Sequence, residues 1–178
     1  MIAALRLATG SASRDAIMAP VKDALSHLDE QGRARMVDVG DKALTRRVAV
    51  AGATVRMLPA TRALALGGGG GKGPVIEVAR LAGIGAAKRT AELIPLCHVL
   101  PLDAVDVTIA PLGDDALAIE ARVGTTWRTG VEMEAFTAAA IAALTLVDML
   151  KAVEKTLVVT DLRLLSKSGG RSGEWRRP

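Results

Sequence analysis

The segment 131–153 constrains the fold of this chain more than any other part. Its central stretch, Ala138-Ala-Ala-Ile-Ala-Ala-Leu144, is small and apolar on every side of a helix. A helix that is apolar all round is normally buried, so we expect a long helix that its neighbours cover on all sides. The apolar run ends at Asp148 and is well short of the roughly 20 residues that cross a membrane. The segment therefore predicts the core helix of a protein that does not enter the membrane.

Hydrophobic periodicity elsewhere predicts strands and further helices. Alternating apolar residues at 105–109 and 117–123 predict a β-hairpin with one buried face. Pro59 and Pro74 stand where helices begin, and Pro95 ends the second helix because its ring cannot continue one. The other expected elements are a strand at 35–39, a strand at 46–57 with a turn at Gly52, helices at 59–66 and 74–92, and a final strand at 157–159 and 162–165. The expected class is α+β, an antiparallel sheet with helices packed on one face.

The size and the apolar excess of the chain favour one oligomeric domain. Its 178 residues are enough to bury a proper core. Half of the residues are hydrophobic, and the mean hydropathy is +0.31, so we expect apolar faces to be covered in an oligomer. Residues 1–24 are expected to be a disordered extension, 25–173 a single domain and 174–178 a flexible tail.

The cysteine, histidine and charge content narrows the function. One cysteine, Cys97, excludes an intrachain disulfide and fits the reducing cytoplasm. Two histidines are too few for a structural zinc site of the Cys/His type. The net charge is +4, but the basic residues are dispersed and no Phe or Tyr alternates with them, which argues against nucleic-acid binding. A small polyanion such as a nucleotide phosphate suits scattered basic residues that folding gathers at one pocket.

Polar residues that interrupt the apolar sequence are candidates for proton-transfer chemistry. Cys97 and His98 stand in a stiff loop between Pro95 and Pro101. Glu132 and Glu134 lie two apart at the start of the long helix and should point to different sides. Carboxylates, imidazoles and amines are the groups that serve as acids and bases in enzymes.

Asp148 and Lys151 are spaced i, i+3 on one face of the long helix, and two interpretations stay open. One is a surface ion pair worth only about 0.2–0.5 kcal/mol. The other is an acid/base pair in a desolvated site, with Asp148 holding Lys151 in place. Asp148 closes the apolar run, which favours a position near the core and the second interpretation.

Two basic positions also have alternative interpretations. Five glycines precede Lys72, but a phosphate-binding P-loop requires Gly and Ser or Thr where this chain has Leu66 and Gly73. The glycines are therefore either a flexible linker or a mobile loop that delivers Lys72 to an anion. Lys88, followed by Arg89, either complements the negative end of its helix or faces the same pocket as His98.

Taken together, these motifs resemble the molybdenum-cofactor biosynthesis protein C family, the cyclic pyranopterin monophosphate synthases. The resemblance covers nearly the whole chain. It rests on Met36-Val-Asp-Val39, Ala79-Arg-Leu-Ala-Gly-Ile84, Ala86-Ala-Lys-Arg-Thr90, Leu93-Ile-Pro-Leu-Cys-His98, Thr129-Gly-Val-Glu-Met-Glu-Ala135, Ala142-Ala-Leu-Thr145, Lys151-Ala-Val153, Arg163-Leu-Leu165 and Lys167-Ser-Gly-Gly170.

The resemblance implies an enzyme, a lyase, that converts 3′,8-cyclo-7,8-dihydroguanosine triphosphate to cyclic pyranopterin monophosphate with loss of diphosphate. It also implies a ferredoxin-like fold and a homohexamer, a trimer of dimers, with the site at a subunit interface. By the resemblance Asp148 and Lys151 are catalytic. The substrate-binding residues are Leu96, Cys97, His98, Met133, Glu134, Arg47, Lys72 and Lys88. We expect no cofactor and no metal site in the protein; Arg47, Lys72 and Lys88 can neutralise the triphosphate in place of a metal, and whether a divalent ion also takes part stays open.

Two other classes are weighed against this enzyme. A non-catalytic nucleotide-binding or assembly protein would keep the cations but tolerate loss of Asp148. An RNA-binding module would bind RNA with a steep dependence on salt.

Overall fold

The computed structural model describes residues 28–29, 31–68 and 73–178. The chain divides into two units, Met1–Arg35 and Met36–Pro178. In the described part of the first unit, Asp29 accepts a hydrogen bond from the backbone N–H of Arg33 and forms an ion pair with the Arg33 guanidinium. The extension predicted at 1–24 lies outside the described residues.

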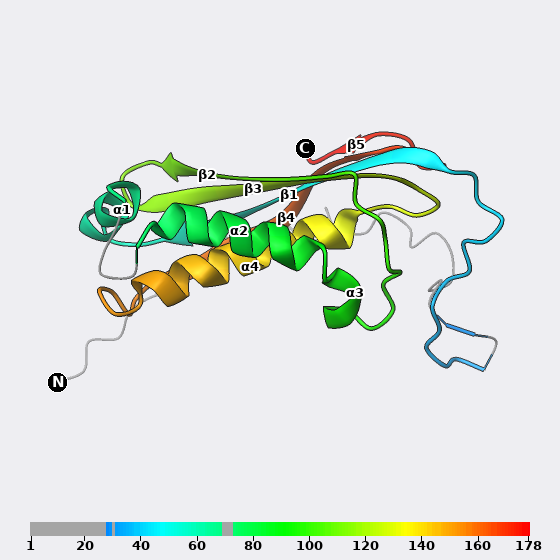
Figure 1. Ribbon diagram of the computed structural model, residues 1–178, viewed down its shortest axis with the longest axis horizontal. Coiled ribbons are helices and arrows are strands. Elements are labelled where there is room, and N and C mark those ends of the chain that lie inside the picture. Colours follow the sequence, from blue (N-terminus) through cyan, green and yellow to red (C-terminus); the bar gives the residue numbers. More distant parts are fainter. Residues whose placement is uncertain (1–27, 30, 69–72) are drawn as a thin grey trace, which may run out of the picture. The chain divides into compact units, whose positions relative to one another are not determined.

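The second unit is built on a five-stranded antiparallel sheet (Figure 1). The order across the sheet is β2-β3-β1-β4-β5, and every neighbouring pair is antiparallel. The strands are β1 (Thr45–Arg56), β2 (Ala104–Leu112), β3 (Ala116–Trp127), β4 (Val158–Ser168) and β5 (Trp175–Arg176). The predicted hairpin is confirmed as β2 and β3, in which Val107, Leu117 and Val123 are fully buried whereas Glu120 and Arg122 are exposed.

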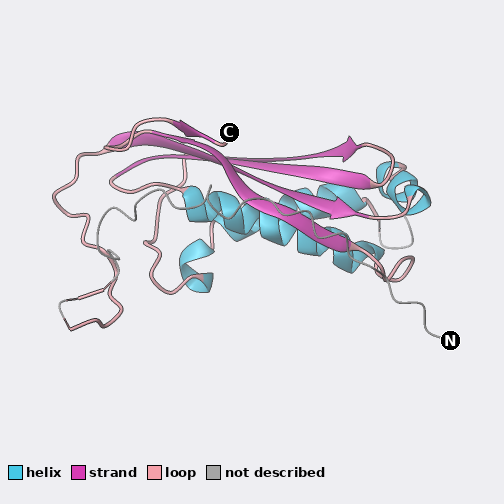
Figure 2. Ribbon diagram, turned by 180° about the vertical axis from the view of Figure 1, so that it is seen from behind, coloured by secondary structure: helices cyan, strands magenta, loops and turns pink. Residues whose placement is uncertain are grey.

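The helices are α1 (Pro59–Leu66), α2 (Val75–Ala87), α3 (Thr90–Leu93) and α4 (Glu132–Leu150). The long helices α2 and α4 run along the same face of the sheet in opposite directions (Figures 1 and 2). The predicted α+β class is therefore confirmed. Because α2 and α4 are antiparallel, the end of α2 and the start of α4 lie at the same end of the sheet.

Small side chains let α4 lie close to its neighbours. Five of its alanines are fully buried, namely Ala135, Ala138, Ala139, Ala142 and Ala143. By length and composition α4 could also cross a membrane, but it packs on β1, β3, β4 and α2 as a core helix does. The prediction that its neighbours cover it all round is wrong for this chain alone, since Leu144 is 56% exposed.

Three further predictions differ from the structure. Residues 35–39 form no strand. The turn expected at Gly52 is absent as well: β1 continues through this residue, and Leu165 packs in the space that a side chain at Gly52 would take. The helix expected at 74–92 breaks after Ala87, where the hydroxyl of the buried Thr90 bonds the Ala87 carbonyl. Residues 175–176, expected in a flexible tail, pair with β4 because their backbone groups complete the edge of that strand.

The crossing of α2 and α4 at Gly83 yields a prediction. A Cβ at Gly83 would lie 2.9 Å from the Ala138 carbonyl oxygen and 3.2 Å from Cβ of Ala142. Gly85, two residues on, has nothing within 4 Å of such a Cβ. Both changes to Ala gain helix propensity, but only Gly83→Ala forces the helices apart. We expect Gly83→Ala to be less stable than Gly85→Ala by about 1–3 kcal/mol, the usual cost of overpacking.

Urea unfolding of both variants at one protein concentration measures this difference. Equal stabilities would show that the helix crossing can widen without cost.

Candidate active site

The loop after α3 positions Cys97 and His98 at the start of α4. Pro95 occupies the second position of a turn in which the Cys97 N–H donates to the Ile94 carbonyl at 3.0 Å. Nε2 of His98 lies 2.8 Å from the Val37 carbonyl oxygen. A carbonyl only accepts, so Nε2 carries the hydrogen, and Nδ1 keeps its lone pair whenever the ring is neutral. His98 is thus oriented with one nitrogen available for proton transfer.

Glu134 is the buried carboxyl group of this region, with 4% of its surface exposed. Burial raises its pKa from 4.5 to about 7, and the charge of Glu132 adds to the rise. Burial, and then the charge of Glu134, raise the pKa of the Cys97 thiol. The first turn of α4 therefore holds a carboxyl group that exchanges its proton near neutral pH, beside the predicted Cys97–His98 loop.

Glu132 and Glu134 point to different sides, as their spacing predicts. The Glu132 carboxylate accepts a hydrogen bond from Nζ of Lys167 on β4 at 3.0 Å, and both side chains are about one-third exposed. Met133, between them, is 39% exposed, and Leu96 in the preceding loop is half-buried.

Arg47 lies at the same end of the sheet, near the beginning of β1. Its Nε donates to the Thr45 hydroxyl at 2.8 Å, and its Nη2 donates to the Arg128 carbonyl at 3.2 Å. The Gly170 backbone passes so close that a Cβ there would overlap Nη1 of Arg47. A cavity of about 380 Å³ opens here, and Lys42 and Arg171 also line it.

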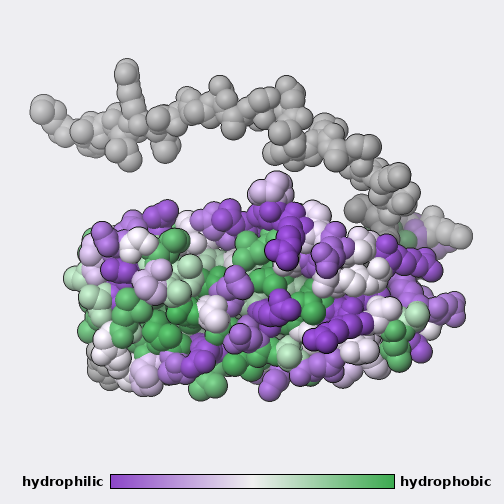
Figure 3. Space-filling view, turned by 90° about the horizontal axis from the view of Figure 1, so that it is seen from above, coloured by the Kyte–Doolittle hydropathy of each residue, from purple (hydrophilic) through white to green (hydrophobic). Residues whose placement is uncertain are grey.

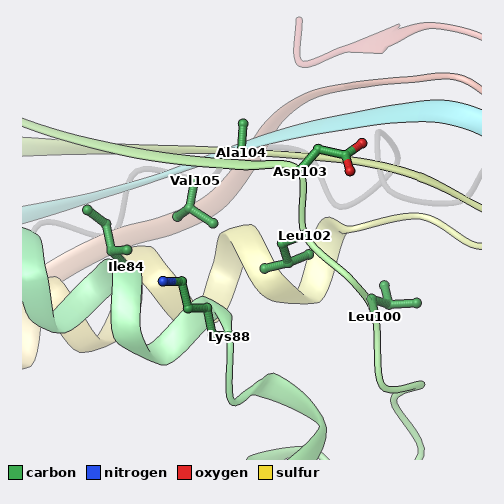
Figure 4. A pocket seen from close by; sticks show the side chains of 7 residues that line it. All are labelled: Ile84, Lys88, Leu100, Leu102, Asp103, Ala104 and Val105. Carbon is green, nitrogen blue, oxygen red and sulfur yellow. The ribbon is translucent and has the colours of Figure 1, made fainter.

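Lys88 lines a different cavity, of about 430 Å³, between the end of α2 and the start of β2. Figure 4 shows its amine beside Ile84 and below Val105, while the carboxylate of Asp103 points away. Arg89 instead forms an exposed ion pair with Glu92 at 2.9 Å. Apart from Lys88 and Asp103, the side chains that line this pocket are apolar, and Lys88 is its single cation.

Asp148 and Lys151 form an ion pair at the far end of α4. Nζ of Lys151 lies 2.6 Å from Oδ1 of Asp148, and each side chain is 61% exposed. The predicted position of Asp148 near the core is wrong, because Leu146 and Leu150 take the buried face of that turn. The pairing confirms that the two groups interact, but this chain alone does not remove them from solvent.

The structure therefore brings the predicted site residues together in two groups. Cys97, His98, Glu134 and Arg47 lie around the start of α4. Asp148 and Lys151 follow Glu134 by fourteen or more residues, which is about 21 Å along a helix. Lys72 lies outside the described residues. Among the residues that the structure describes, no three His, Cys, Asp or Glu side chains gather as metal ligands would.

Sequence reasoning missed the cations that accompany Arg47 and Glu132. Lys42 lies more than a hundred residues before Lys167 and Arg171 in the chain. Lys167 pairs with Ala49 of β1, which turns its side chain to the helix side of the sheet. That register can be read only once the order of the strands is known.

The chain is similar to a group of known proteins along most of its length. It matches the model of the MoaC family over residues 36–170. It is 60% identical over 156 residues to the cyclic pyranopterin monophosphate synthase of Chloroflexus aggregans, which covers 87% of this chain and 94% of that protein. It is 58% identical over 154 residues to the protein of that name from Thermomicrobium roseum, covering 86% and 93%. With cyclic pyranopterin monophosphate synthase 3 of Mycobacterium tuberculosis it shares 58% identity over 153 residues, 86% of each chain.

The raised pKa of Glu134 yields a prediction about stability and pH. The folded state holds this proton up to about pH 7, whereas the unfolded state releases it near pH 4.5. The contribution of Glu134 to stability is therefore complete below pH 4.5 and is lost as the pH rises to 7. We expect Glu134→Gln to remove this loss, so its stability relative to wild type should increase between pH 4.5 and 7.

Unfolding midpoints measured across this pH range check the prediction. Glu92→Gln, which removes an exposed carboxylate, is the matched control and should follow wild type. A constant difference between Glu134→Gln and wild type at all pH values would contradict the assignment.

Proposed function

The chain belongs to the MoaC family, and we propose that it is a cyclic pyranopterin monophosphate synthase. The reaction converts the 3′,8-cyclised dihydro-GTP to cyclic pyranopterin monophosphate and diphosphate, an early step of molybdenum cofactor biosynthesis. The observation that carries the proposal is the close pair of Asp148 and Lys151. Both fall inside the family match, as does the cluster around Glu134.

The chemistry requires a polyphosphate to be bound and several protons to be moved. As diphosphate leaves, the bond from the α-phosphorus to the bridging oxygen breaks, and that oxygen keeps the electron pair. A hydroxyl oxygen of the same substrate forms the new bond to the α-phosphorus and gives up its proton. The purine ring must also be opened and closed again, which takes further proton transfers.

We assign the proton transfers to the two ends of α4. Lys151 is the general acid, and Asp148 holds its ammonium group in place or accepts a proton. Glu134 and His98 bind the substrate, and the raised pKa of Glu134, about 7, suits proton exchange near neutral pH. Arg47, Lys72 and Lys88 neutralise the triphosphate, which needs fixed positive charge where the leaving group forms.

The separation of the two groups supports a site shared between subunits. A helix cannot shorten to bring Asp148 to Glu134, so a neighbouring copy must supply one group for both to act on one substrate. Exposed apolar side chains support this assembly, among them Leu144 at the outer side of α4 and Val99, which is 85% exposed. The face of the sheet away from the helices also gathers hydrophobic side chains between charged ones (Figure 3).

The order of the helices and strands supports a further part of the proposal, the type of fold. A strand, helices, two strands, a helix and a strand follow each other, and β2-β3-β1-β4 is the order across the sheet. This order of elements supports our proposal that the fold is ferredoxin-like. We further propose a homohexamer of three dimers in the cytoplasm, where the free thiol of Cys97 stays reduced.

Loss of either member of the Asp148–Lys151 pair should stop the chemistry. We expect Asp148→Asn and Lys151→Ala each to lower turnover by roughly 10²- to 10⁴-fold, the usual contribution of a general acid or base. The assay supplies the cyclised dihydro-GTP and measures diphosphate and the cyclic-phosphate pterin. Lys155→Ala, which changes an exposed lysine four residues beyond Lys151 and outside α4, is the control and should keep full activity.

Near-normal turnover in both variants would refute the catalytic roles. Binding of the substrate without any product from the wild-type protein would favour the non-catalytic nucleotide-binding class.

A site shared between subunits predicts that two inactive variants restore activity when mixed. We expect Asp148→Asn and Glu134→Gln chains to be almost inactive alone. Co-expressed in equal amounts, they should form about a quarter of their sites from two intact halves. Light scattering of the wild-type protein first establishes the size of the assembly.

Mixtures that stay as inactive as their parents would place both groups of a site in the same chain. Co-expression of Asp148→Asn with Lys151→Ala is the control, since these changes affect the same half and cannot complement each other.

A further inference from the structure

The cavity beside Arg47 combines several cations with little negative charge. Three basic side chains line it, namely Lys42, Arg47 and Arg171. Asp41 is the one carboxylate in the lining, and its other polar side chain is the hydroxyl of Thr45. A cavity of about 380 Å³ with this lining favours an anion with several negative charges over a neutral ligand.

These three cations differ in their partners from the basic residues that form ion pairs on the described surface. Arg56, Arg80, Arg89, Arg163 and Lys167 each form an ion pair with a carboxylate. Within the described part of the chain, no ion pair is formed by Lys42, Arg47 or Arg171. Their positive charge is thus not neutralised by an ion pair among the described residues, although Asp41 also lines the cavity.

The cavity is also shaped by the backbone. Thr45 and the Arg128 carbonyl hold two nitrogens of the Arg47 guanidinium, which fixes the plane of the group. Gly170 has a φ of 73° and lies against Nη1 of Arg47, where any side chain would overlap it. A guanidinium held in one orientation loses little freedom on binding and matches the oxygen atoms of a phosphate.

We propose that this cavity binds the terminal two phosphates of the substrate, with Lys42 and Arg171 as binding residues beside Arg47. The identity of the substrate rests on the proposed function, whereas the anion site rests on the cavity itself. Because the leaving diphosphate gains charge as the bond breaks, cations at its position stabilise the transition state as well as the bound substrate. The same site should bind free inorganic diphosphate, the second product.

Calorimetric titration of the full-length protein with inorganic diphosphate tests the site directly. Lys42→Gln and Arg171→Gln should each weaken binding by roughly 10- to 100-fold, as expected for the loss of a charge-assisted hydrogen bond. Arg56→Gln is the matched control, because it removes one positive charge from the opposite end of β1, where Arg56 pairs with Asp115 at 3.1 Å. This control should bind diphosphate as wild type does.

Three results would overturn the proposal. The first is a wild-type protein that does not bind diphosphate, and the second is unchanged binding in both variants. The third is equal weakening in Arg56→Gln, which would indicate an effect of net charge. Unfolding curves confirm that each variant is folded before it is titrated.

Kinetics separate the failure of this site from the failure of the proposed function. If Lys42→Gln and Arg171→Gln turn over the cyclised dihydro-GTP with unchanged KM, the function stands and the phosphate site is wrong. If diphosphate binds as expected but the wild-type protein forms no product, the anion site stands and the function is wrong. If both are right, KM and the inhibition constant of diphosphate rise together in both variants.

Discussion

The rest of the structure depends on the close packing of α4 against the sheet and against α2. Five fully buried alanines and the side-chain-free surface of Gly83 hold this helix in one position. Because the helix is rigid, its packing fixes the position of Glu134 at one end and of the Asp148–Lys151 pair at the other end. The same packing keeps them about 21 Å apart. The packing of α4 therefore fixes the positions of Glu134 and of the Asp148–Lys151 pair and also keeps them apart.

The two ends of α4 have opposite electrostatic environments. At its start, burial raises the pKa of Glu134 to about 7. In the described part of the chain, Lys42, Arg47 and Arg171 line a cavity there and form no ion pair. At its end, Lys151 already has a partner in Asp148.

Much of the fold could be predicted from sequence because period-two alternation and prolines act locally. The hairpin and the helix that starts at Pro59 follow from such signals. Asp148 shows where this reasoning fails. Its place at the end of an apolar run does not reveal which side of the helix it faces. Asp148 follows the buried Leu146 by two residues, which is a rotation of about 200° around the helix axis. Lys42 and Arg171 could not be predicted together, because only the paired strands and the turn at Gly170 bring them to one cavity. Local patterns thus predicted the elements, whereas the cation cluster required the tertiary fold.

The exposure of the Asp148–Lys151 pair indicates why assembly matters for the proposed activity. An ion pair in water is worth little, since water screens both charges. The same pair under a second subunit and a bound substrate would be desolvated, and its interactions would then be several times stronger. Under the proposed function, a single chain would carry the residues of the reaction but would bring the two groups neither together nor out of water. If the proposed function holds, proton transfer by Lys151 requires a neighbouring copy that covers it. Oligomerisation would then serve catalysis as well as the burial of Leu144 and Val99.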